Sequence, residues 1–468
     1  MAGVDGGGGG TARRARVAVF PLPFQGHISP ALQLAGALHA RGLAVTVLHT
    51  AFNAPDPARH PALSFVAVPD AVPEAVAGGG GNGIAKILAL NAAMEASGRV
   101  RDALASLLRR SEEEDEEPRR LACVVIDSTL TAVQKAAASL GLPTLVLHTG
   151  GAACFRLFRS YDMLHDKGYF PATESNLDMP VKELPPLLVR DLFDPSKLPS
   201  KEIGPKILKL ATETTTNSMG AILNTFDALE AYELGMIRDE LPESIPAFAV
   251  GPLHKLSSCN SAETSLLNHD RSCIEWLDTQ IPSSVLYVSF GSVVHVTQEE
   301  FMEVAWGLAN SGKPFLWVVR RGLIIGVDKL ELPERFVCAV GDRGKVIEWA
   351  PQQEVLAHSS VGGFWTHNGW NSTLESIYEG VPMLSRPIFG DQLATGRYVA
   401  HTWKIGILLE GVLERGRIEM VIRKLMEEEG VEMRERAKGL KKKAHKCLES
   451  SGSSQQAIDK LVDHILSL

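Results

Sequence analysis

A pattern of apolar strand, helix and apolar strand recurs along this chain, and it limits the possible fold more than any other feature. Residues 17–20 are rich in β-branched and aromatic side chains, as a buried strand requires. Apolar residues then follow at helical spacing as far as Gly42, a stop signal, and residues 44–48 form a second apolar strand. The pattern returns at 121–149 and at 284–319. Consecutive strands that are joined through a helix lie parallel, so we predict parallel sheets covered by helices.

The length of the chain, 468 residues, exceeds what one core usually holds and predicts two domains. A polar segment without periodicity, 251–271, separates two halves that each carry the pattern. We therefore predict an α/β fold with a disordered leader at 1–16, a doubly wound Rossmann-like domain at 17–250, a linker at 251–271 and a second such domain at 272–450. We expect residues 451–468 to form a helix that packs back on the first domain. Because ligands of such sheets bind at the carboxyl ends of the strands, the two domains should face each other across a cleft.

Composition excludes several classes of protein. Hydrophobic residues make up 45% and charged residues 22%, typical of a soluble globular protein, and the net charge of −8 argues against nucleic-acid or anionic-membrane partners. Six scattered cysteines indicate neither a disulfide framework nor a zinc site. No apolar run is long enough to span a membrane and the N-terminus lacks a signal sequence, so we expect a cytoplasmic protein. The chain has no dinucleotide fingerprint, P-loop, H-E-x-x-H or acidic D-x-D pair.

The segment "FWTHNGWNSTLES", residues 364–376, leads from a predicted strand into a predicted helix. A helix N-terminus exposes unpaired N–H groups and binds anions. Asn371 and Ser372 add side-chain donors, and His367 adds another that could carry charge. The simpler alternative is that Asn371 or Ser372 only caps the helix and Trp370 is part of the core.

Neighbouring segments favour a ligand site over a simple turn. Trp349 and Gln352 follow another strand, Glu375 lies one turn into the helix, and Asp391 and Gln392 follow a further strand end. Together these groups match the parts of a nucleotide sugar, namely a base, a ribose, a diphosphate and a sugar. They are an aromatic surface, an amide, a carboxylate, an anion site and an acid–amide pair.

The segment from 349 to 392 resembles the signature box of plant secondary-product glycosyltransferases, the UDP-dependent family 1 enzymes. "PFQGHISP" at 23–30 and "SVLYVSFGS" at 284–292 extend the similarity over essentially the full chain. "FPLPFQGH" at 20–27 together with "THNGWNSTLES" at 366–376 resembles the subgroup with benzoxazinoid, cytokinin and diterpene glucosyltransferases. The resemblance implies the two-domain GT-B fold, inversion at the anomeric carbon, UDP-glucose as co-substrate, and no metal or other cofactor. Asn368 stands where the family most often has Cys, but this side chain is not expected to touch the donor.

The resemblance also implies roles for individual residues. The donor-binding set is Ser292, Trp349, Ala350, Gln352, His367, Trp370, Asn371, Ser372, Glu375, Asp391, Gln392 and Thr149. In that set Trp349 stacks on uracil, Gln352 and Glu375 hold the ribose, Ser292, His367, Asn371 and Ser372 hold the diphosphate, and Trp370, Asp391 and Gln392 line the sugar.

His27 and Asp127 follow two strands of the first half. Each could be a simple capping residue. However, an acceptor hydroxyl must lose a proton as it attacks, histidine is the usual base near neutral pH, and a carboxylate on its other nitrogen would orient it. The family uses such a pair, and the matching residues are His27 and Asp127.

The acceptor pocket is harder to predict. Thr149 ends the next strand and could border the sugar. The candidates for contact with the acceptor are Phe24, Gly26, Phe155, Phe158 and Leu187, although an ordinary core position would explain them equally well.

We predict a monomeric, inverting, metal-independent glucosyltransferase with a small apolar or aromatic acceptor, such as a benzoxazinoid, cytokinin, flavonoid, phenolic or terpenoid. The alternatives are a nucleotide-sugar-binding protein without turnover, which the presence of both His27 and Asp127 argues against, and an NAD-linked oxidoreductase, which the missing fingerprint argues against.

Overall fold

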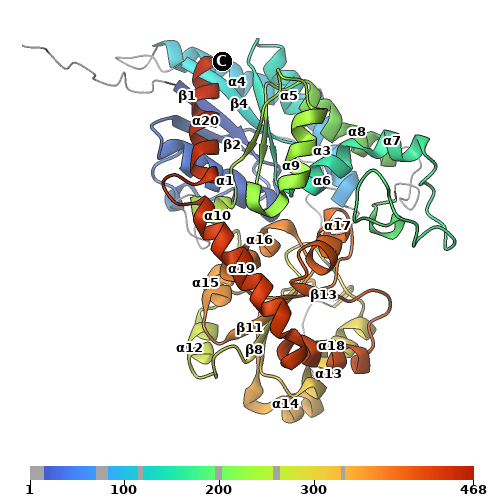
Figure 1. The fold of residues 1–468 in the computed structure, drawn as a ribbon. Coiled ribbons are helices and arrows are strands. Elements are labelled where there is room, and N and C mark those ends of the chain that lie inside the picture. The colour runs from blue at the N-terminus through green and yellow to red at the C-terminus, as the bar shows by residue number, and fades with distance from the viewer. Residues whose placement is uncertain (1–14, 70–82, 114–119, 195–202, 257–263, 328–331) are drawn as a thin grey trace, which may run out of the picture.

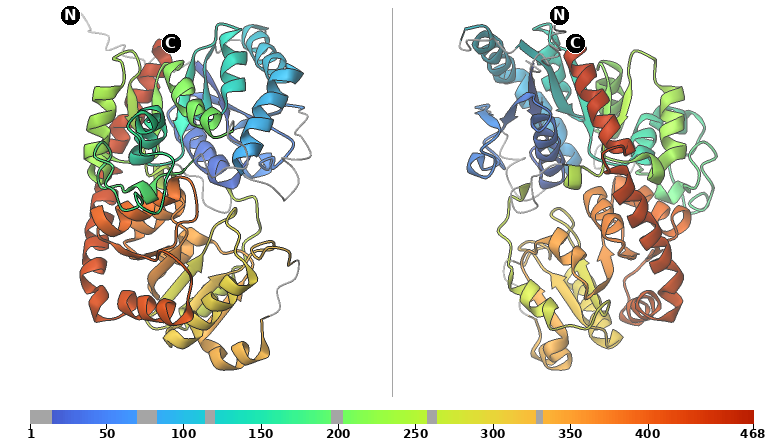
Figure 2. Two further views of the ribbon diagram at one scale, coloured as in Figure 1. Left: turned by 90° about the vertical axis from the view of Figure 1, so that its right-hand side faces the viewer. Right: turned by 60° about the vertical axis from the view of Figure 1, so that its left-hand side comes forward.

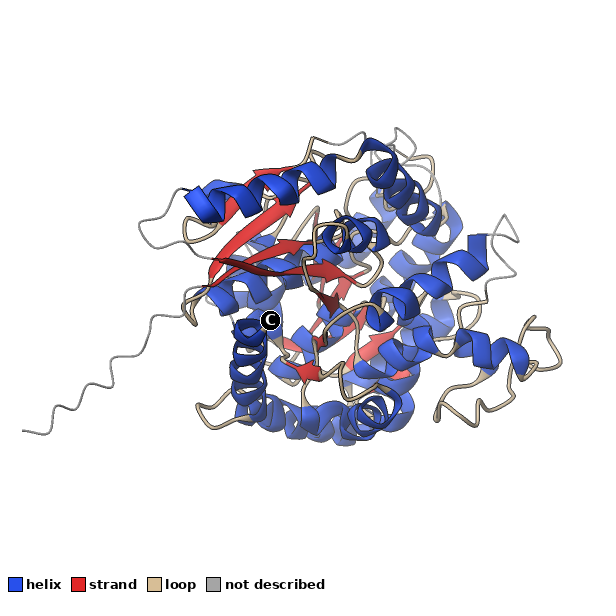
Figure 3. Ribbon diagram, turned by 90° about the horizontal axis from the view of Figure 1, so that it is seen from above, coloured by secondary structure: helices blue, strands red, loops and turns tan. Residues whose placement is uncertain are grey.

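The structure, a computed structural model, describes residues 15–69, 83–113, 120–194, 203–256, 264–327 and 332–468. It has two domains, each with a parallel sheet between layers of helices (Figures 1 and 3). The predicted two-domain α/β architecture is confirmed. Most of the predicted leader, residues 1–14, lies outside the described residues. Ala15 and Arg16, which we assigned to that leader, already pair with the neighbouring strand of the first sheet.

The first sheet contains seven strands in the order β3-β2-β1-β4-β5-β6-β7. They are β1 (Ala15–Phe20), β2 (Ala44–His49), β3 (Ser64–Ala67), β4 (Arg120–Asp127), β5 (Thr144–His148), β6 (Ala221–Leu223) and β7 (Ala247–Ala249). The strand order reverses between β1 and β4, which pair directly with Phe20 opposite Ile126. The residues that follow these two strands therefore emerge side by side at the switch point, where doubly wound sheets bind ligands.

The second sheet contains six parallel strands in the order β10-β9-β8-β11-β12-β13. They are β8 (Val285–Ser289), β9 (Phe315–Val318), β10 (Gly344–Ile347), β11 (Val361–Thr366), β12 (Met383–Ser385) and β13 (Gly406–Leu408). Its order reverses between β8 and β11, so the segments after these strands also lie next to each other.

The helices connect the strands and cover the sheets (Figure 2). The first domain has α1 (Gln25–His39), α3 (Gly83–Ser97), α4 (Arg99–Glu113), α5 (Thr131–Ala138), α6 (Ala152–Arg159), α7 (Tyr161–Asp166), α8 (Ile203–Thr216), α9 (Asp227–Glu240) and α10 (Leu253–Leu256). The second half has α12 (Ser272–Asp278), α13 (Gln298–Ser311), α14 (Glu334–Val340), α15 (Gln352–Ala357), α16 (Trp370–Glu379), α17 (Asp391–Arg397), α18 (Arg415–Met426), α19 (Val431–Cys447) and α20 (Ser453–Ser467). Short helical turns are η1 (Pro57–Arg59), η2 (Val189–Asp191), η4 (Gly341–Arg343), η5 (Tyr398–Thr402) and η6 (Glu428–Gly430).

The predicted linker contributes to both domains. Within it, residues 257–263 lie outside the described part of the chain. Leu253 of α10 is fully buried in the core of the first domain, whereas the backbone N–H of Asp270 donates to the carbonyl of Trp349 in the second.

The end of the chain returns to the first domain. Helix α19 runs from the second domain towards the first, and α20 lies against the first sheet (Figure 1). Four apolar side chains of α20 are fully buried in the same core cluster as β1 and α1: Ile458, Leu461, Val462 and Ile465. None of the helices built from the described residues combines the length and apolarity needed to cross a membrane.

Candidate active site between the domains

A cleft of about 350 Å³ lies where the carboxyl ends of the two sheets face each other. Fifteen of the predicted site residues line it: Phe24, Gly26, His27, Thr149, Ser292, Trp349, Ala350, Gln352, His367, Trp370, Asn371, Ser372, Glu375, Asp391 and Gln392. This volume is that of a small-molecule site. The two halves of the chain thus contribute to one site.

His27 and Asp127 form a hydrogen-bonded pair at the switch point of the first sheet. Asp127 is the last residue of β4, and His27 lies in the first turn of α1, directly after β1. The His27 Nδ1 and the Asp127 Oδ2 are 2.6 Å apart. The Asp127 side chain is only 1% exposed, whereas that of His27 is 30% exposed and reaches the cleft. With Nδ1 bound to the carboxylate, the imidazole has Nε2 left for a ligand.

The surroundings of Asp127 fix its orientation. Its other oxygen, Oδ1, accepts hydrogen bonds from the Thr129 amide at 3.0 Å and from the Thr129 hydroxyl at 2.8 Å. The Thr149 hydroxyl also lies near the His27 Nδ1, at 3.2 Å. Thr149, predicted to border the sugar, therefore also contacts this pair.

Each member of the His27–Asp127 pair stabilises the charged form of the other. Burial lowers the pKa of His27, but the charge and hydrogen bond of Asp127 outweigh it, and the pKa of the imidazole is raised above its usual value. Burial likewise raises the pKa of Asp127, but His27 and the Thr129 donors outweigh that effect and the pKa is lowered. Asp127 consequently stays ionised and stabilises the imidazolium.

Three side chains of the second domain form a hydrogen-bonded group at the ribose position of the predicted site. Gln352, the first residue of α15, donates to the Ser372 hydroxyl at 2.9 Å and to the Glu375 carboxylate at 2.7 Å. Gln353, which sequence reasoning missed although it adjoins Gln352, donates to the other Glu375 oxygen at 3.0 Å. Burial raises the pKa of Glu375, and the two amide donors act against that rise. Glu375 is thus held as an acceptor before any ligand binds.

Trp349 lies at the edge of the cleft beside the linker. Its indole N–H is 3.3 Å from the Ser265 hydroxyl. Ser265 and its neighbour Thr264 line the cleft and bond the first domain as well, because the Thr264 carbonyl accepts from Gln25 at 3.0 Å. This contribution of the linker was not foreseen, since a polar aperiodic segment carries no ligand signature.

The turn before α16 differs from the sequence prediction in two respects. The N-cap is Gly369, without a side-chain cap hydrogen bond, so the capping role considered for Asn371 and Ser372 is wrong. Asn371 instead donates across the cleft to the Gly26 carbonyl at 2.9 Å. His367, for which we considered a charge, is half-buried, and this partial burial lowers its pKa to about 4. It is therefore a neutral imidazole at pH 7.

Trp370 and Asn368 occupy buried positions beside this turn. The Trp370 ring is 4% exposed and its N–H donates to the Asn224 carbonyl of the first domain at 2.7 Å, so it contacts both the cleft and the domain interface. Asn368 has a φ of 63° and donates to the Ser385 hydroxyl at 3.0 Å. Asparagine tolerates this left-handed conformation better than most residues. Asn368 does not line the cleft, consistent with the expectation that it leaves the donor untouched.

Asp391 and Gln392 begin α17, six residues after β12 rather than at the strand end that we predicted. The side-chain carbonyl of Gln392 accepts hydrogen bonds from the backbone amides of Ile388 and Phe389, at 3.0 and 3.3 Å. Burial raises the pKa of Asp391 to about 6, with His27 acting in the opposite direction.

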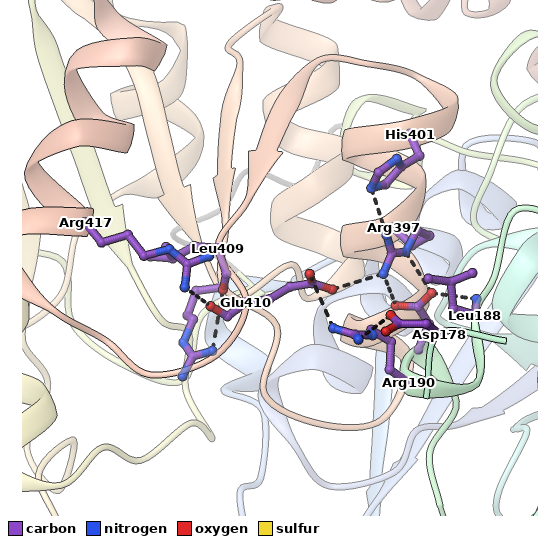
Figure 4. A network of polar contacts seen from close by, with 10 residues as sticks. Asp178, Leu188, Arg190, Arg397, His401, Leu409, Glu410 and Arg417 are labelled. Carbon is purple, nitrogen blue, oxygen red and sulfur yellow. Dashed lines mark hydrogen bonds and ion pairs between the residues drawn. The ribbon is translucent and has the colours of Figure 1, made fainter. Parts of the chain in front are cut away.

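The far end of α17 is tied to the first domain by a buried ion pair. Arg397 donates to both oxygens of Asp191, at 2.8 and 3.0 Å, and to Glu410 at 3.0 Å. Figure 4 shows this network, with Arg190 and Asp178 at its solvent-exposed side. The side chains of Arg397 and Asp191 are 7% and 5% exposed. The helix that carries Asp391 is thereby fixed relative to the domain that carries His27.

The acceptor prediction is partly wrong. Phe155 and Leu187 are 1% and 2% exposed and belong to hydrophobic cores, and neither they nor Phe158 line the cleft. Phe155 and Phe158 instead pack on the edge of the His148 ring, with centroids 5.3 and 6.1 Å away. An apolar residue near a strand end can belong to a core or to a pocket. Here the packing of α6 places Phe155 and Phe158 away from the cleft.

Other residues of the cleft were not foreseen. Among them are Ile87, His254, Tyr287 and Phe389. Ile87 and Phe389 add apolar surface, and only their place in the fold reveals them. In the described part of the chain, no cluster of three or more His, Cys, Asp and Glu side chains could hold a metal ion.

Comparison with known proteins shows which family the chain belongs to. Residues 223–434 match the family model described as UDP-glucoronosyl and UDP-glucosyl transferase. The chain is 46% identical to the Zea mays protein named DIMBOA UDP-glucosyltransferase BX8, over 94% of this chain and 96% of that one. It is 41% identical to UDP-glycosyltransferase 76F2 of Arabidopsis thaliana, over 97% of each.

A solved structure has the same fold. It is Phytolacca americana UGT2 complexed with UDP-2fluoro-glucose and pterostilbene, which is 28% identical and superposes with a TM-score of 0.80 over 96% of this chain and 99% of that one. The described structure, with its two facing Rossmann-like domains, has the GT-B fold that the resemblance implied. The chain therefore belongs to the family of UDP-dependent plant glycosyltransferases and is an enzyme of that family.

Proposed function

We propose that this enzyme transfers glucose from UDP-glucose to a hydroxyl of a small plant metabolite, with inversion at the anomeric carbon and without a metal ion. The observation that carries the proposal is the His27–Asp127 pair, 2.6 Å apart, which opens on the same cleft as the ordered Gln352–Ser372–Glu375 group.

In the proposed reaction, His27 Nε2 accepts the proton of the acceptor hydroxyl while the oxygen attacks the anomeric carbon. The bond between that carbon and the β-phosphate oxygen breaks on the opposite face, and UDP leaves with the electron pair. Asp127 holds the imidazole in the required tautomer and stabilises its protonated form. Attack from the face opposite the leaving group inverts the anomeric configuration.

The donor would be held by the second domain. We propose that Trp349 and Ala350 contact uracil, that Gln352 and Glu375 bind the ribose, and that Asp391, Gln392, Trp370 and Thr149 surround the glucose. Ser292, His367, Asn371 and Ser372 would bind the diphosphate at the N-terminus of α16, whose free N–H groups and dipole favour anions. This arrangement supports a reaction without metal, since donors aimed at the leaving group can replace a cation.

The acceptor would occupy the first-domain side, beside Phe24, Gly26 and Ile87. The name of one protein compared includes DIMBOA, and the Phytolacca americana structure is complexed with pterostilbene; both support our proposal of a small aromatic acceptor. We also propose that the enzyme is monomeric and cytoplasmic, on the basis of the sequence alone. The alternative considered from the sequence, a nucleotide-sugar-binding protein without turnover, does not agree with membership of this enzyme family.

One experiment tests the proposal. The purified protein is incubated with UDP-glucose or UDP-galactose and a panel of benzoxazinoids, cytokinins, flavonoids and terpenoid alcohols, with and without EDTA. We expect a hexose gain by mass spectrometry, a β-glucoside by NMR, a preference for UDP-glucose in kcat/KM, and no effect of EDTA. UDP binding without any product would contradict the proposed acceptor classes, and activity that EDTA removes and Mg²⁺ restores would contradict the metal-independent part.

A further inference from the structure

The diphosphate side of the cleft has little positive charge of its own. Among the described residues that line the cleft, none is a lysine or an arginine. Two carboxylates, Glu375 and Asp391, line it, and the His367 imidazole is neutral near pH 7 because its pKa is lowered to about 4. A diphosphate brings at least two negative charges into this space, so a fixed positive charge directly behind the wall has an unusually large influence.

Arg320 supplies such a charge. It follows β9, and its Nε donates to the Gly291 carbonyl at 3.0 Å. Its Nη2 donates to the Val294 carbonyl and its Nη1 to the Arg321 carbonyl at 3.1 Å. Within the described chain, no carboxylate forms an ion pair with it. Partial burial lowers the pKa of Arg320, which nevertheless stays charged.

Arg386, the arginine that directly follows β12, differs in this respect. Its Nη2 is 3.9 Å from the Glu300 carboxylate, so its charge is partly compensated. Arg320 therefore has the less compensated charge of the two.

The loop that Arg320 holds is a wall of the cleft. Gly291, Ser292 and Val293 line the cleft, and Gly291 has a φ of 70°. A Cβ at Gly291 would lie 2.5 Å from the Cε1 of His367, so the loop packs directly on that ring. Because a peptide group is planar and trans, the N–H of Ser292 points opposite to the Gly291 carbonyl, away from Arg320. The arginine thus polarises a peptide whose donor lies on the other side of the loop.

We propose that Arg320 is a positioning residue for the leaving diphosphate, which fixes the 291–294 loop and supplies positive potential through it. The inference rests on the proposed function, because it needs a UDP-sugar in this cleft. When the bond from the anomeric carbon to the phosphate oxygen breaks, its electron pair stays on that oxygen, and the diphosphate gains one negative charge. A fixed cation stabilises this state more than the bound substrate, so its effect falls mainly on kcat.

The test compares Arg320→Gln and Arg320→Lys with a matched control, Arg321→Gln. Arg321 is the next residue and loses the same charge, but its side chain is 84% exposed and pairs with Glu348 at the surface. For each protein, calorimetry gives the Kd of UDP and of UMP, steady-state kinetics give kcat and KM for UDP-glucose, and thermal unfolding checks the fold.

For Arg320→Gln we expect kcat to fall about 10²-fold, as for the loss of one oxyanion donor. UDP binding should weaken about tenfold and UMP binding by less than about twofold, since UMP lacks the second phosphate near the loop. Arg320→Lys keeps the charge, so it should keep the preference for UDP over UMP while losing part of kcat. Arg321→Gln should match the wild type.

Three results overturn the inference. The first is a ratio of UDP affinity to UMP affinity that is the same in Arg320→Gln as in the wild type. The second is a ratio that falls equally in Arg320→Gln and Arg320→Lys, although the lysine keeps the charge. The third is an Arg321→Gln control as impaired as Arg320→Gln. If Arg320→Gln does not fold, Arg320→Lys alone decides. Because this variant keeps the positive charge, equal affinities for UDP and UMP would contradict a role of the charge. A wild-type protein that neither binds UDP nor turns over UDP-glucose instead refutes the proposed function.

Discussion

The two sides of the cleft are built differently. The donor side comes mostly from one continuous stretch, 349–392, and its polar side chains already bond one another, as in the Gln352–Ser372–Glu375 group. The proposed acceptor side combines segments far apart in the chain, including those that carry Phe24 and Ile87, and these two side chains are apolar. The contrast suggests that fixed hydrogen bonds define a single donor, whereas an apolar acceptor wall sets shape and admits related molecules.

The largest effect should come from removing the base on the acceptor side. We expect His27→Ala to lower kcat by about 10²–10⁴, the usual contribution of general-base catalysis, while UDP affinity stays unchanged because the donor side is separate. Turnover by product formation and UDP binding by calorimetry are measured on the same preparation. Near wild-type turnover would make His27 a structural residue, and a large loss of UDP affinity would break the separation of the two sides.

The second effect concerns the ion pair that joins the two sides. Arg397→Met leaves Asp191 buried without its partner, which typically costs about 3–5 kcal/mol in the free energy of unfolding. Denaturant unfolding measures this. Arg190→Met is the control, because Arg190 belongs to the same network at 32% exposure and should cost no more than about 1 kcal/mol. Equal losses for the two variants would contradict the importance of burial.

The third effect tests the donor side alone. Trp349→Ala should weaken UDP binding by about 1–3 kcal/mol, the contribution of aromatic stacking on a base. Trp276→Ala is a suitable control, since Trp276 is also half-buried but lies outside the cleft. Calorimetry with UDP distinguishes them. A folded Trp349→Ala protein with unchanged affinity would remove Trp349 from the donor site.

The smallest effect is a shift in the pH profile. The base must be neutral, and Asp127 raises the pKa of His27, so kcat/KM should rise with pH through that raised pKa. Asp127→Asn removes the charge that stabilises the imidazolium, so the acidic limb should move to lower pH, while kcat falls by less than in His27→Ala. A profile from pH 5 to 9 for both proteins measures this. An acidic limb that stays in place would assign it to another group, with Asp391, pKa about 6, as the first candidate.

The resemblance of residues 349–392 to a family signature identified the proposed donor residues, and the fact that these lie close in sequence at strand ends and helix starts explains why they line one cleft. The His27–Asp127 pair could be predicted for a different reason. The two residues are 100 positions apart, but each follows a strand of one parallel sheet, and β1 and β4 are neighbours at its switch point.

The errors arise where packing between distant segments decides. Phe155 and Leu187 are residue types that often line apolar pockets. However, the packing of α6 and of the segment before η2 buries them in hydrophobic cores. The bonds from Asn371 to Gly26 and from Trp370 to Asn224 cross the domain interface, and no local pattern encodes them. The neutral state of His367 depends on its partial burial between Gly291 and Gly369, which sequence alone does not give.

The position of α20 has a consequence for how the chain is made. One face of the first sheet is completed by side chains such as Ile458 and Leu461, which are synthesised long after the strands of that sheet. After β7 is synthesised, roughly 200 residues must follow before this helix is available, about 10–40 s at usual rates of translation. During that time the nascent first domain exposes an apolar face, so we expect it to reach its final packing only after α20 has been synthesised. A messenger RNA truncated before the codons of α20 would therefore disturb the packing of the first domain, whose strands are encoded far upstream.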